Sequence, residues 1–329
     1  MRIAIDGMGG DHAPQAVVDG VVMAAKEYDY DVVLVGDKTV LRRELSRYRR
    51  YPENIFIEHA SEVVAMDEAP AVSVRKKRNS SIAVGIELIK SGEADAFVSA
   101  GNTGAVVCSA TLGLGLLPGI ERPGISIVFP TFKGVSIMID VGANIDPKPL
   151  HLLHYGIMGD AYCKYILNKS KPTIGLLSIG EEATKGTDFI KETHKLLEES
   201  KLNFAGNIEG RDVFTGRCDV VLCDGFVGNV VLKVAEGIGG AITKLLKSQI
   251  KNSVLAKIGA LLSKPAFMRL WKDLDYSEYG GAPLLGVDGH VIISHGSSTA
   301  KALKNAIRRG AEFKENELNK RIIEELESY

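Results

Sequence analysis

Short apolar runs alternate with segments of helical periodicity along most of the chain. The runs lie at 3–5, 32–35, 55–58, 96–99, 173–178, 218–223 and 291–294. Each run has no more than eight residues and is bounded by polar or glycine-rich turns. This pattern is typical of a buried strand. Most are followed by a stretch with the i, i+3, i+4 spacing of an amphipathic helix. Repeated strand–turn–helix units predict an α/β fold, a three-layer α/β/α sandwich.

One pair of runs departs from this alternation. Ile125–Phe129 and Val135–Ile139 are separated only by Pro130–Gly134. So short a connection cannot hold a crossover helix, so the two runs should form an antiparallel hairpin. The sheet is therefore predicted to be mixed but mostly parallel, within a single catalytic domain that spans residues 1–329, with one or two lobes.

The segment 252–274 has a different pattern. Val254, Ile258, Leu261 and Leu262 fall on one helical face, and the same spacing resumes after Pro265 in a stretch that contains Trp271, the only tryptophan. Lysines lie close to this face. Core packing or a dimer contact would explain the pattern, and so would a protruding amphipathic helical hairpin that lies on an anionic membrane surface.

Composition excludes several classes of protein. The chain has 329 residues, 45% hydrophobic and 25% charged, with a formal net charge of −1. A general polyanion-binding protein is therefore excluded, and any charged partner must meet a local patch. The four cysteines form no Cys-x-x-Cys pair, which argues against a zinc ribbon and for free thiols in a reducing cytosol. Neither a signal peptide nor 18 uninterrupted apolar residues is found, so no membrane span is expected.

Common nucleotide and hydrolase motifs are missing. No Gly-x-Gly-x-x-Gly follows the first strand, and no Gly-x-x-x-x-Gly-Lys-Ser/Thr loop is present. Gly-x-Ser-x-Gly and His-Glu-x-x-His are missing as well. These observations argue against a P-loop kinase, a nicotinamide enzyme and a serine hydrolase.

Three glycine-rich turns, each between a predicted strand and helix, carry the positive signal. The first turn consists of Gly101, Asn102, Thr103 and Gly104. The second runs from Gly225 to Asn229 and includes Gly228, and the third consists of Gly296, Ser297 and Ser298. Such turns aim backbone N–H groups at an anion, although small residues also serve close packing. Because carboxyl ends of parallel strands share one edge of a sheet, the turns should meet there. With Lys185 at the same edge, a phosphate-sized anion is the better interpretation.

Polar side chains near these turns are candidates for catalysis. Asn229 or a backbone N–H could stabilise a developing oxyanion. Asp224 or His12 could orient or deprotonate a bound phosphate, and the sequence does not choose between them. Asp11 and His12 could pair on a metal ion, but a hydrogen-bonding role for His12 is favoured, and no metal site is predicted.

A run of four basic residues, Arg75, Lys76, Lys77 and Arg78, precedes a predicted helix at about Ser80. Such a run is usually a solvated surface, or it could dock an acidic protein. Nucleic acid is disfavoured because no aromatic residues interleave with the charges.

Several segments resemble the PlsX-type phosphate acyltransferases, in order and nearly end to end. These are Asp6–Pro14, Ser99–Ala105, Asp140–Asn144, Asp224–Asn229, Tyr279–Ala282 and His295–Ser298. One departure is Gly7, where the family is expected to have alanine. The resemblance implies transfer of a long-chain acyl group from acyl carrier protein to orthophosphate, which yields acyl phosphate for bacterial phospholipid synthesis.

The same resemblance implies a fold like that of isopropylmalate dehydrogenase and phosphotransacetylase, with no cofactor. It also implies a homodimer in the cytoplasm that is peripherally associated with the membrane, where a glycerol-3-phosphate acyltransferase would use the product. Acyl carrier protein is acidic, which gives Arg75–Arg78 a partner. Two alternatives remain: a metal- and NAD-dependent β-decarboxylating dehydrogenase on the same fold, and a non-catalytic membrane adaptor.

Overall fold

The fold was analysed in a computed structural model of the chain, which describes residues 1–268 and 279–328. The strands are β1 (Arg2–Asp6), β2 (Asp31–Gly36), β3 (Ile55–His59), β4 (Ala96–Ser99), β5 (Gly124–Thr131), β6 (Gly134–Ile139), β7 (Ile174–Leu177), β8 (Phe204–Ile208), β9 (Val220–Leu222), β10 (Ala282–Leu285) and β11 (His290–Ile293). The helices are α1 (Gln15–Glu27), α2 (Lys38–Leu45), α3 (Pro70–Lys76), α4 (Ser81–Lys90), α5 (Thr103–Gly113), α6 (Pro149–Tyr165), α7 (Asp188–Glu198), α8 (Gly225–Lys251), α9 (Val254–Leu262), α11 (Ala300–Glu315) and α12 (Leu318–Glu327).

The strands form one sheet in the order β3-β2-β1-β4-β11-β10-β5-β6-β9-β7-β8. β5 and β6 pair antiparallel, as the short Pro130–Gly134 connection predicted. β10 pairs antiparallel with both β11 and β5, and the remaining neighbours are parallel. The mixed, mostly parallel sheet is confirmed. β10 itself was not predicted, because a four-residue run that contains Pro283 carries little strand signal.

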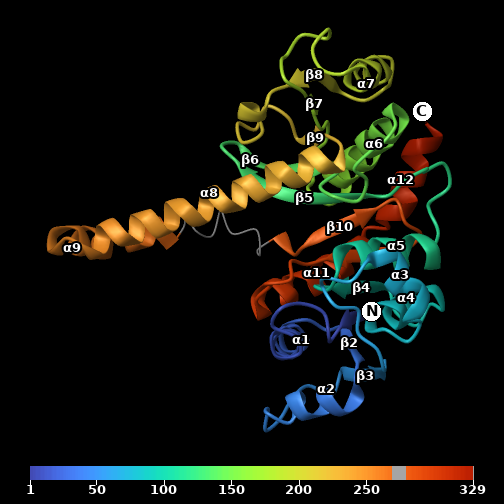
Figure 1. Cartoon of the computed structure of the whole chain (residues 1–329), viewed down its shortest axis with the longest axis vertical. Coiled ribbons are helices and arrows are strands. Elements are labelled where there is room, and N and C mark those ends of the chain that lie inside the picture. The colour runs from blue at the N-terminus through green and yellow to red at the C-terminus, as the bar shows by residue number, and fades with distance from the viewer. Residues whose placement is uncertain (269–278, 329) are drawn as a thin grey trace.

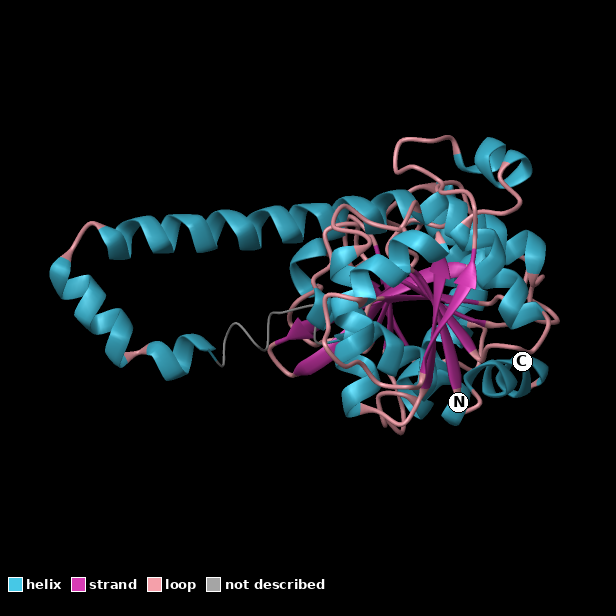
Figure 2. Ribbon diagram, turned by 90° about the horizontal axis from the view of Figure 1, so that it is seen from below, coloured by secondary structure: helices cyan, strands magenta, loops and turns pink. Residues whose placement is uncertain are grey.

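Helices cover both faces of the sheet (Figures 1 and 2). Alternate residues of β1 separate the two layers of core: Ile3 and Ile5 join one apolar cluster, and Ala4 joins the other. The first cluster contains residues of α1, α6 and α11, and the second contains residues of α4 and α5. Because both faces are buried, the strands read as continuous apolar runs, and the predicted three-layer sandwich is confirmed.

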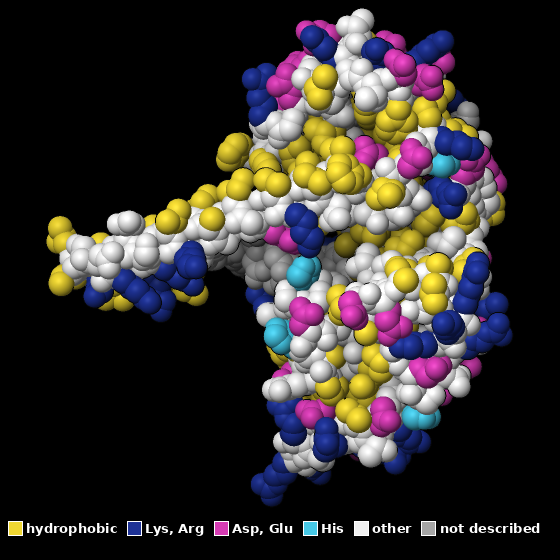
Figure 3. Space-filling view, in the orientation of Figure 1, with side chains coloured by type: hydrophobic (Ala, Val, Ile, Leu, Met, Phe, Trp, Pro, Cys, Tyr) yellow, Lys and Arg dark blue, Asp and Glu magenta, His cyan; other side chains and the backbone are white. Residues whose placement is uncertain are grey.

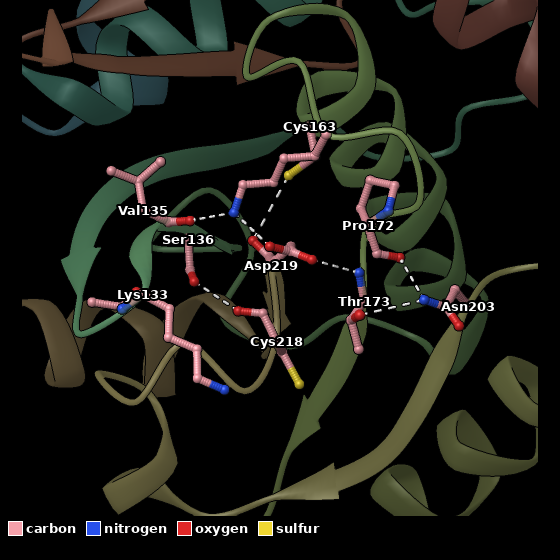
Figure 4. A network of polar contacts seen from close by, with 11 residues as sticks. Lys133, Val135, Ser136, Cys163, Pro172, Thr173, Asn203, Cys218 and Asp219 are labelled. Carbon is pink, nitrogen blue, oxygen red and sulfur yellow. Dashed lines mark hydrogen bonds and ion pairs between the residues drawn. The ribbon is translucent and has the colours of Figure 1, made fainter.

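A polar network joins the amino ends of β6, β7 and β9 (Figure 4). The Asp219 carboxylate accepts a hydrogen bond from the backbone N–H of Thr173 at 2.8 Å and one from Lys169. The Ser136 hydroxyl donates to the carbonyl of Cys218 at 2.6 Å. The network lies at the opposite end of these strands from the predicted anion-binding turns, so its role is to fix the strands in register.

The second half of α8 and the whole of α9 project from the body as an arm, with α9 folded back beside the end of α8 (Figures 1 and 2). Large apolar side chains on α8 and α9 are exposed, among them Val234, Ile238, Ile242, Leu245, Val254, Ile258, Leu261 and Leu262. Hydrophobic side chains follow one edge of the arm, and basic side chains gather near its tip (Figure 3). By length and composition alone, α8 could cross a membrane, although its first turns pack on the body.

The projection begins earlier than the expected hairpin at 252–274, because the long α8 supplies one of its two sides. A turn at Ser263 separates α9 from the residues that contain Pro265, as the proline predicted. Trp271 lies outside the described residues. Of the predicted membrane-facing residues, Val254, Ile258, Leu261 and Leu262 are exposed.

Candidate active site

A cavity of about 350 Å³ opens where α8 leaves the body. Its walls include residues from all three glycine-rich turns: Thr103 and Gly104, then Asn229, then Ser298. Apolar side chains form the remaining wall, namely Ile125, Ile127, Val128, Val141, Leu232, Ala282 and Ile293. The turns predicted to share one edge of the sheet therefore do meet. An apolar pocket with a few convergent polar groups is the usual form of a small-molecule site.

The first turn leads into α5, and Asn102 caps that helix. Its side-chain oxygen accepts from the N–H of Ala105 at 3.0 Å, and its Nδ2 donates to three carbonyls of the segment 65–68. Asn102 is therefore occupied as a cap and a tether. Thr103 and Gly104, in the first turn of α5, line the cavity, and their N–H groups have no acceptor inside the helix.

The loop after β6 is organised by the buried carboxylate of Asp140. Its Oδ1 accepts from the N–H groups of Ile125, Gly142 and Ala143 at 2.9–3.0 Å. Its Oδ2 accepts from the N–H of Asn144 at 2.6 Å. These bonds curl the loop so that Gly142 borders the cavity.

The second turn differs from the expected anion nest. The N–H of Gly225 donates to the carbonyl of Asn144, and the N–H of Val227 donates to the Asp224 carboxylate. Gly228 lies so close to the Asp140 carbonyl that a Cβ there would be only 1.9 Å from the oxygen. Gly228 thus serves close packing, and Asp224 is the N-cap of α8.

One face of α8 borders the cavity with polar side chains. Asn229, Lys233 and Glu236 recur at i, i+4 and i+7, which brings them to one side of the helix. Asn229 was predicted from the sequence, whereas Lys233 was not. Its four-residue spacing from Asn229 is the signal that would have found it. The Lys233 Nζ lies 3.5 Å from the Glu236 carboxylate.

The third turn presents His295, which from the sequence is only the start of the segment His295–Ser298, with no assigned role. Its Nδ1 accepts from the backbone N–H of Ser297 at 3.2 Å and lies 2.8 Å from the Ser297 hydroxyl. Its Nε2 lies 3.5 Å from the Lys233 Nζ. Ser294 and Ser298 are buried beside it and also line the cavity. This turn, rather than the second, carries the densest set of polar groups.

Three predicted catalytic residues do not line the cavity: Asp224, which caps α8, Lys185 and His12. Lys185 is exposed on the loop after β7 and does not line the cavity. His12 lines a separate, open pocket beside the start of α1. Their proposed roles stay predictions. Cys223 is buried behind the second turn, where burial raises the pKa of its thiol well above the usual value and its Sγ donates to the Asp140 carbonyl. A neutral thiol held this way is a poor nucleophile.

The basic run lies on α3 and the turn after it, next to the first glycine-rich turn. A Cβ on Gly104 would meet Pro70 at 2.5 Å, so α3 rests directly against the start of α5. Arg75, Lys76 and Arg78 are exposed. Lys77 points inward, donates to the carbonyl of Val63 at 2.7 Å, and pairs with Glu68. Three of the four predicted docking residues are therefore available on the surface.

The cavity joins hydrogen-bond donors to an apolar wall. That arrangement suits a substrate with an anionic head beside a hydrocarbon chain. Among residues 1–268 and 279–328, no group of three or more His, Cys, Asp or Glu side chains is placed to hold a metal ion.

The sequence is similar to known proteins over its whole length. Residues 1–321 match the family described as "Fatty acid synthesis protein". A phosphate acyltransferase from Pelotomaculum thermopropionicum is 52% identical and aligns over 100% of this chain and 96% of its own. One from Geotalea uraniireducens is 50% identical over 99% of this chain and 94% of its own.

Solved structures with low sequence identity share the fold. A phosphotransacetylase from Streptococcus pyogenes superposes with a TM-score of 0.65 at 19% identity and covers 94% of this chain and 93% of its own. A phosphotransacetylase from Staphylococcus aureus gives a TM-score of 0.62 at 16% identity, with 95% and 94% covered. The phosphotransacetylase-like fold implied by the resemblance is confirmed.

Proposed function

The chain belongs to the phosphate acyltransferase family, and from that premise we propose that it transfers a long-chain acyl group from acyl carrier protein to orthophosphate. Acyl transfer that involves phosphate is the activity of the family. The carrier protein, the long chain and the role in phospholipid synthesis are the finer parts of the proposal. The observation that carries it is one cavity, lined by described residues, in which N–H donors and polar side chains face an apolar wall.

The reaction exchanges one bond to the acyl carbon for another. An oxygen of HPO₄²⁻ attacks the thioester carbon, the carbon–sulfur bond breaks, and the phosphate proton ends on the leaving thiolate. The products are acyl phosphate and the free carrier thiol. Phosphate is a weak nucleophile, so holding it in line with the carbonyl must supply much of the rate.

The residues around the cavity suit these steps. The N–H groups of Thr103 and Gly104 carry the partial positive charge of a helix start and can bind an anion. The Asn229 amide can donate to the carbonyl oxygen as negative charge develops. Lys185 is assigned to the same phosphate, which requires the loop 179–187 to approach the cavity. The apolar wall would hold the first carbons of the chain.

The surface features extend the proposal to partners. Arg75, Lys76 and Arg78 beside the first turn would dock the acidic carrier protein. The apolar edge and basic tip of the arm would bind another copy of the chain or an anionic membrane, where a downstream glycerol-3-phosphate acyltransferase would receive the lipophilic product. We therefore propose a cytoplasmic homodimer with peripheral membrane contact and no cofactor.

The direct test incubates purified protein with acyl-[acyl carrier protein] and orthophosphate. Loss of the thioester should depend on phosphate, and acyl phosphate should appear in equal amount. An absence of turnover at millimolar phosphate would contradict the proposal. Nicotinamide reduction with a hydroxy acid and a divalent metal would support the dehydrogenase, and carrier or lipid binding without chemistry would support an adaptor.

A further inference from the structure

We propose that Lys233 and His295, assisted by Ser294, bind the orthophosphate substrate on the α8 side of the cavity. This assignment rests on the proposed function and names the side chains that hold its nucleophile. None of the three was predicted to bind phosphate from the sequence. Lys233 and His295 come from α8 and from the turn after β11, so the site exists only in the folded chain.

The first argument is that Nε2 of His295 and Nζ of Lys233, which face each other, are both hydrogen-bond donors. The Ser297 N–H donates to Nδ1 of His295, so Nδ1 is an acceptor and the proton of the neutral ring is on Nε2. The Lys233 ammonium has donors only. Two donors 3.5 Å apart do not satisfy each other. An oxygen anion placed beside both would accept from each, so the two groups are arranged as the donors of an anion site.

The second argument is a buried hydroxyl without a partner. Ser294 is only 4% exposed and lines the same cavity. Within the described residues, its Oγ has no hydrogen-bond partner. A buried hydroxyl left unpaired costs free energy, and a bound oxyanion would remove that cost. Ser294 directly precedes His295, and both residues line the cavity.

The third argument is the charge around the pair. In the part of the chain that the structure describes, Glu236 is the one carboxylate that borders the cavity, and its 3.5 Å separation from Lys233 is a loose contact. Lys233 is 56% exposed, so water screens that pair and the ammonium can turn toward a ligand. Thr103 and Gly104 line the same cavity, and the first-turn N–H groups of α5 add positive potential there. A small dianion fits this balance better than a carboxylate would.

A direct binding measurement tests the assignment without turnover. Inorganic phosphate is titrated into the full chain by calorimetry, with no acyl donor present. Lys233→Met should weaken phosphate binding about 10- to 100-fold, the range for a hydrogen bond to a charged group. Lys195→Met, which removes an exposed lysine on α7, is the matched control and should leave the affinity unchanged.

Substitutions at His295 separate the loss of its N–H donor from the change in side-chain size. Leucine removes the donor and should weaken binding about 3- to 10-fold, whereas glutamine keeps an N–H near the position of Nε2 and should restore most of the affinity. Ser294→Ala should produce a smaller loss than either donor-free variant. Equal losses in His295→Gln and His295→Leu would overturn the proposed role of the imidazole, provided that both variants unfold at the wild-type temperature.

Steady-state kinetics test this assignment separately from the proposed function. They also show whether the pair binds orthophosphate or a phosphodiester on the carrier. The variants should raise the KM for orthophosphate and leave the KM for the acyl donor within about 2-fold, because only phosphate contacts are lost. A rise confined to the KM of the donor would mean that the pair binds a phosphodiester on the carrier, and the assignment would be wrong. Saturable phosphate use by the wild type, with unchanged variants, would reject this site but retain the acyltransferase.

Discussion

Gly228 and Asp140 are in direct contact: a Cβ at Gly228 would lie 1.9 Å from the carbonyl oxygen of Asp140. This contact places the first turn of α8 against the loop that follows β6. Asn229 and Lys233 follow Gly228 on the same helix, so their position at the cavity depends on this contact.

Gly228→Ala should therefore move the start of α8 and lower the free energy of unfolding by about 1–3 kcal/mol, the usual cost of overpacking. Gly237→Ala, on the same helix, has no atom within 4 Å of the added methyl and should raise stability by about 0.5–1 kcal/mol. Urea unfolding of both variants measures the difference. Similar stability in the two would show that the contact is not needed.

The basic residues on and after α3 should control use of the acyl donor. Replacing Arg75, Lys76 and Arg78 with glutamate should raise the KM for acyl-[acyl carrier protein] and remove its dependence on salt, because rim charges act on association. Initial rates at several ionic strengths provide the measurement. Unaltered kinetics would place the docking surface elsewhere.

Lys77 provides a contrast within the same run. Its hydrogen bond to Glu68, together with those from the Ala65 N–H and the Ser73 hydroxyl, lowers the pKa of that carboxyl to about 2, and the Lys77 side chain faces the protein. Lys77→Met should therefore loosen the segment 63–68, seen as faster hydrogen exchange, while the salt dependence of the KM persists.

The apolar side chains of α9 should bind lipid. Leu261 and Leu262 are 72% and 78% exposed, so glutamine at both positions removes apolar surface without opening a core. Binding to anionic vesicles should weaken by at least about 10-fold, with soluble activity retained. Leu112→Gln, at a residue 69% exposed on α5, is the matched control. Loss of folding or of the dimer instead would favour packing as the role of this face.

His290 should make stability sensitive to mild acid. Burial lowers the pKa of its imidazole to about 4, so the folded chain resists protonation that the unfolded chain accepts near pH 6.5. The stabilisation is present above pH 6.5 and is lost as the pH falls toward 4. Between pH 7 and pH 5 the wild type should lose about 2 kcal/mol from this group alone.

His290→Leu removes that titration. Urea unfolding measures the free energy of unfolding at pH 7 and at pH 5. Between these pH values the variant should lose about 2 kcal/mol less than the wild type. Equal losses would mean that another group sets the acid sensitivity. His290 faces Phe313 edge-on, so leucine keeps an apolar contact there.

Lys185 tests the anion site predicted from the sequence alone. If the loop 179–187 approaches the cavity during turnover, Lys185→Ala should raise the apparent KM for phosphate more than it affects carrier binding. A calorimetric titration with phosphate alone should then show a smaller loss than Lys233→Met, because Lys185 lies outside the cavity in this structure. An unchanged phosphate KM would remove Lys185 from the mechanism.

Local pattern was sufficient where the signal lies within a few residues. The apolar run at 96–99 coincides with β4, and the short 130–134 connection produced the hairpin of β5 and β6. β10 was missed because it acquires its strand geometry from pairing with β5 and β11, partners that lie far away or arrive later in the chain.

For the site, the sequence by itself determined which turns follow strands, and parallel strands bring such turns to one edge. Only the tertiary structure decided which groups remain free there. The N–H of Gly225 is used by Asn144, Asn102 is a cap and tether, and Lys185 lies outside the cavity. Lys233 and His295 meet because the fold brings α8 beside the turn that follows β11, with 3.5 Å between Nζ and Nε2. Whether a hydrogen-bond donor remains free to bind a ligand depends on contacts between distant segments of the chain. The residue type alone does not determine those contacts.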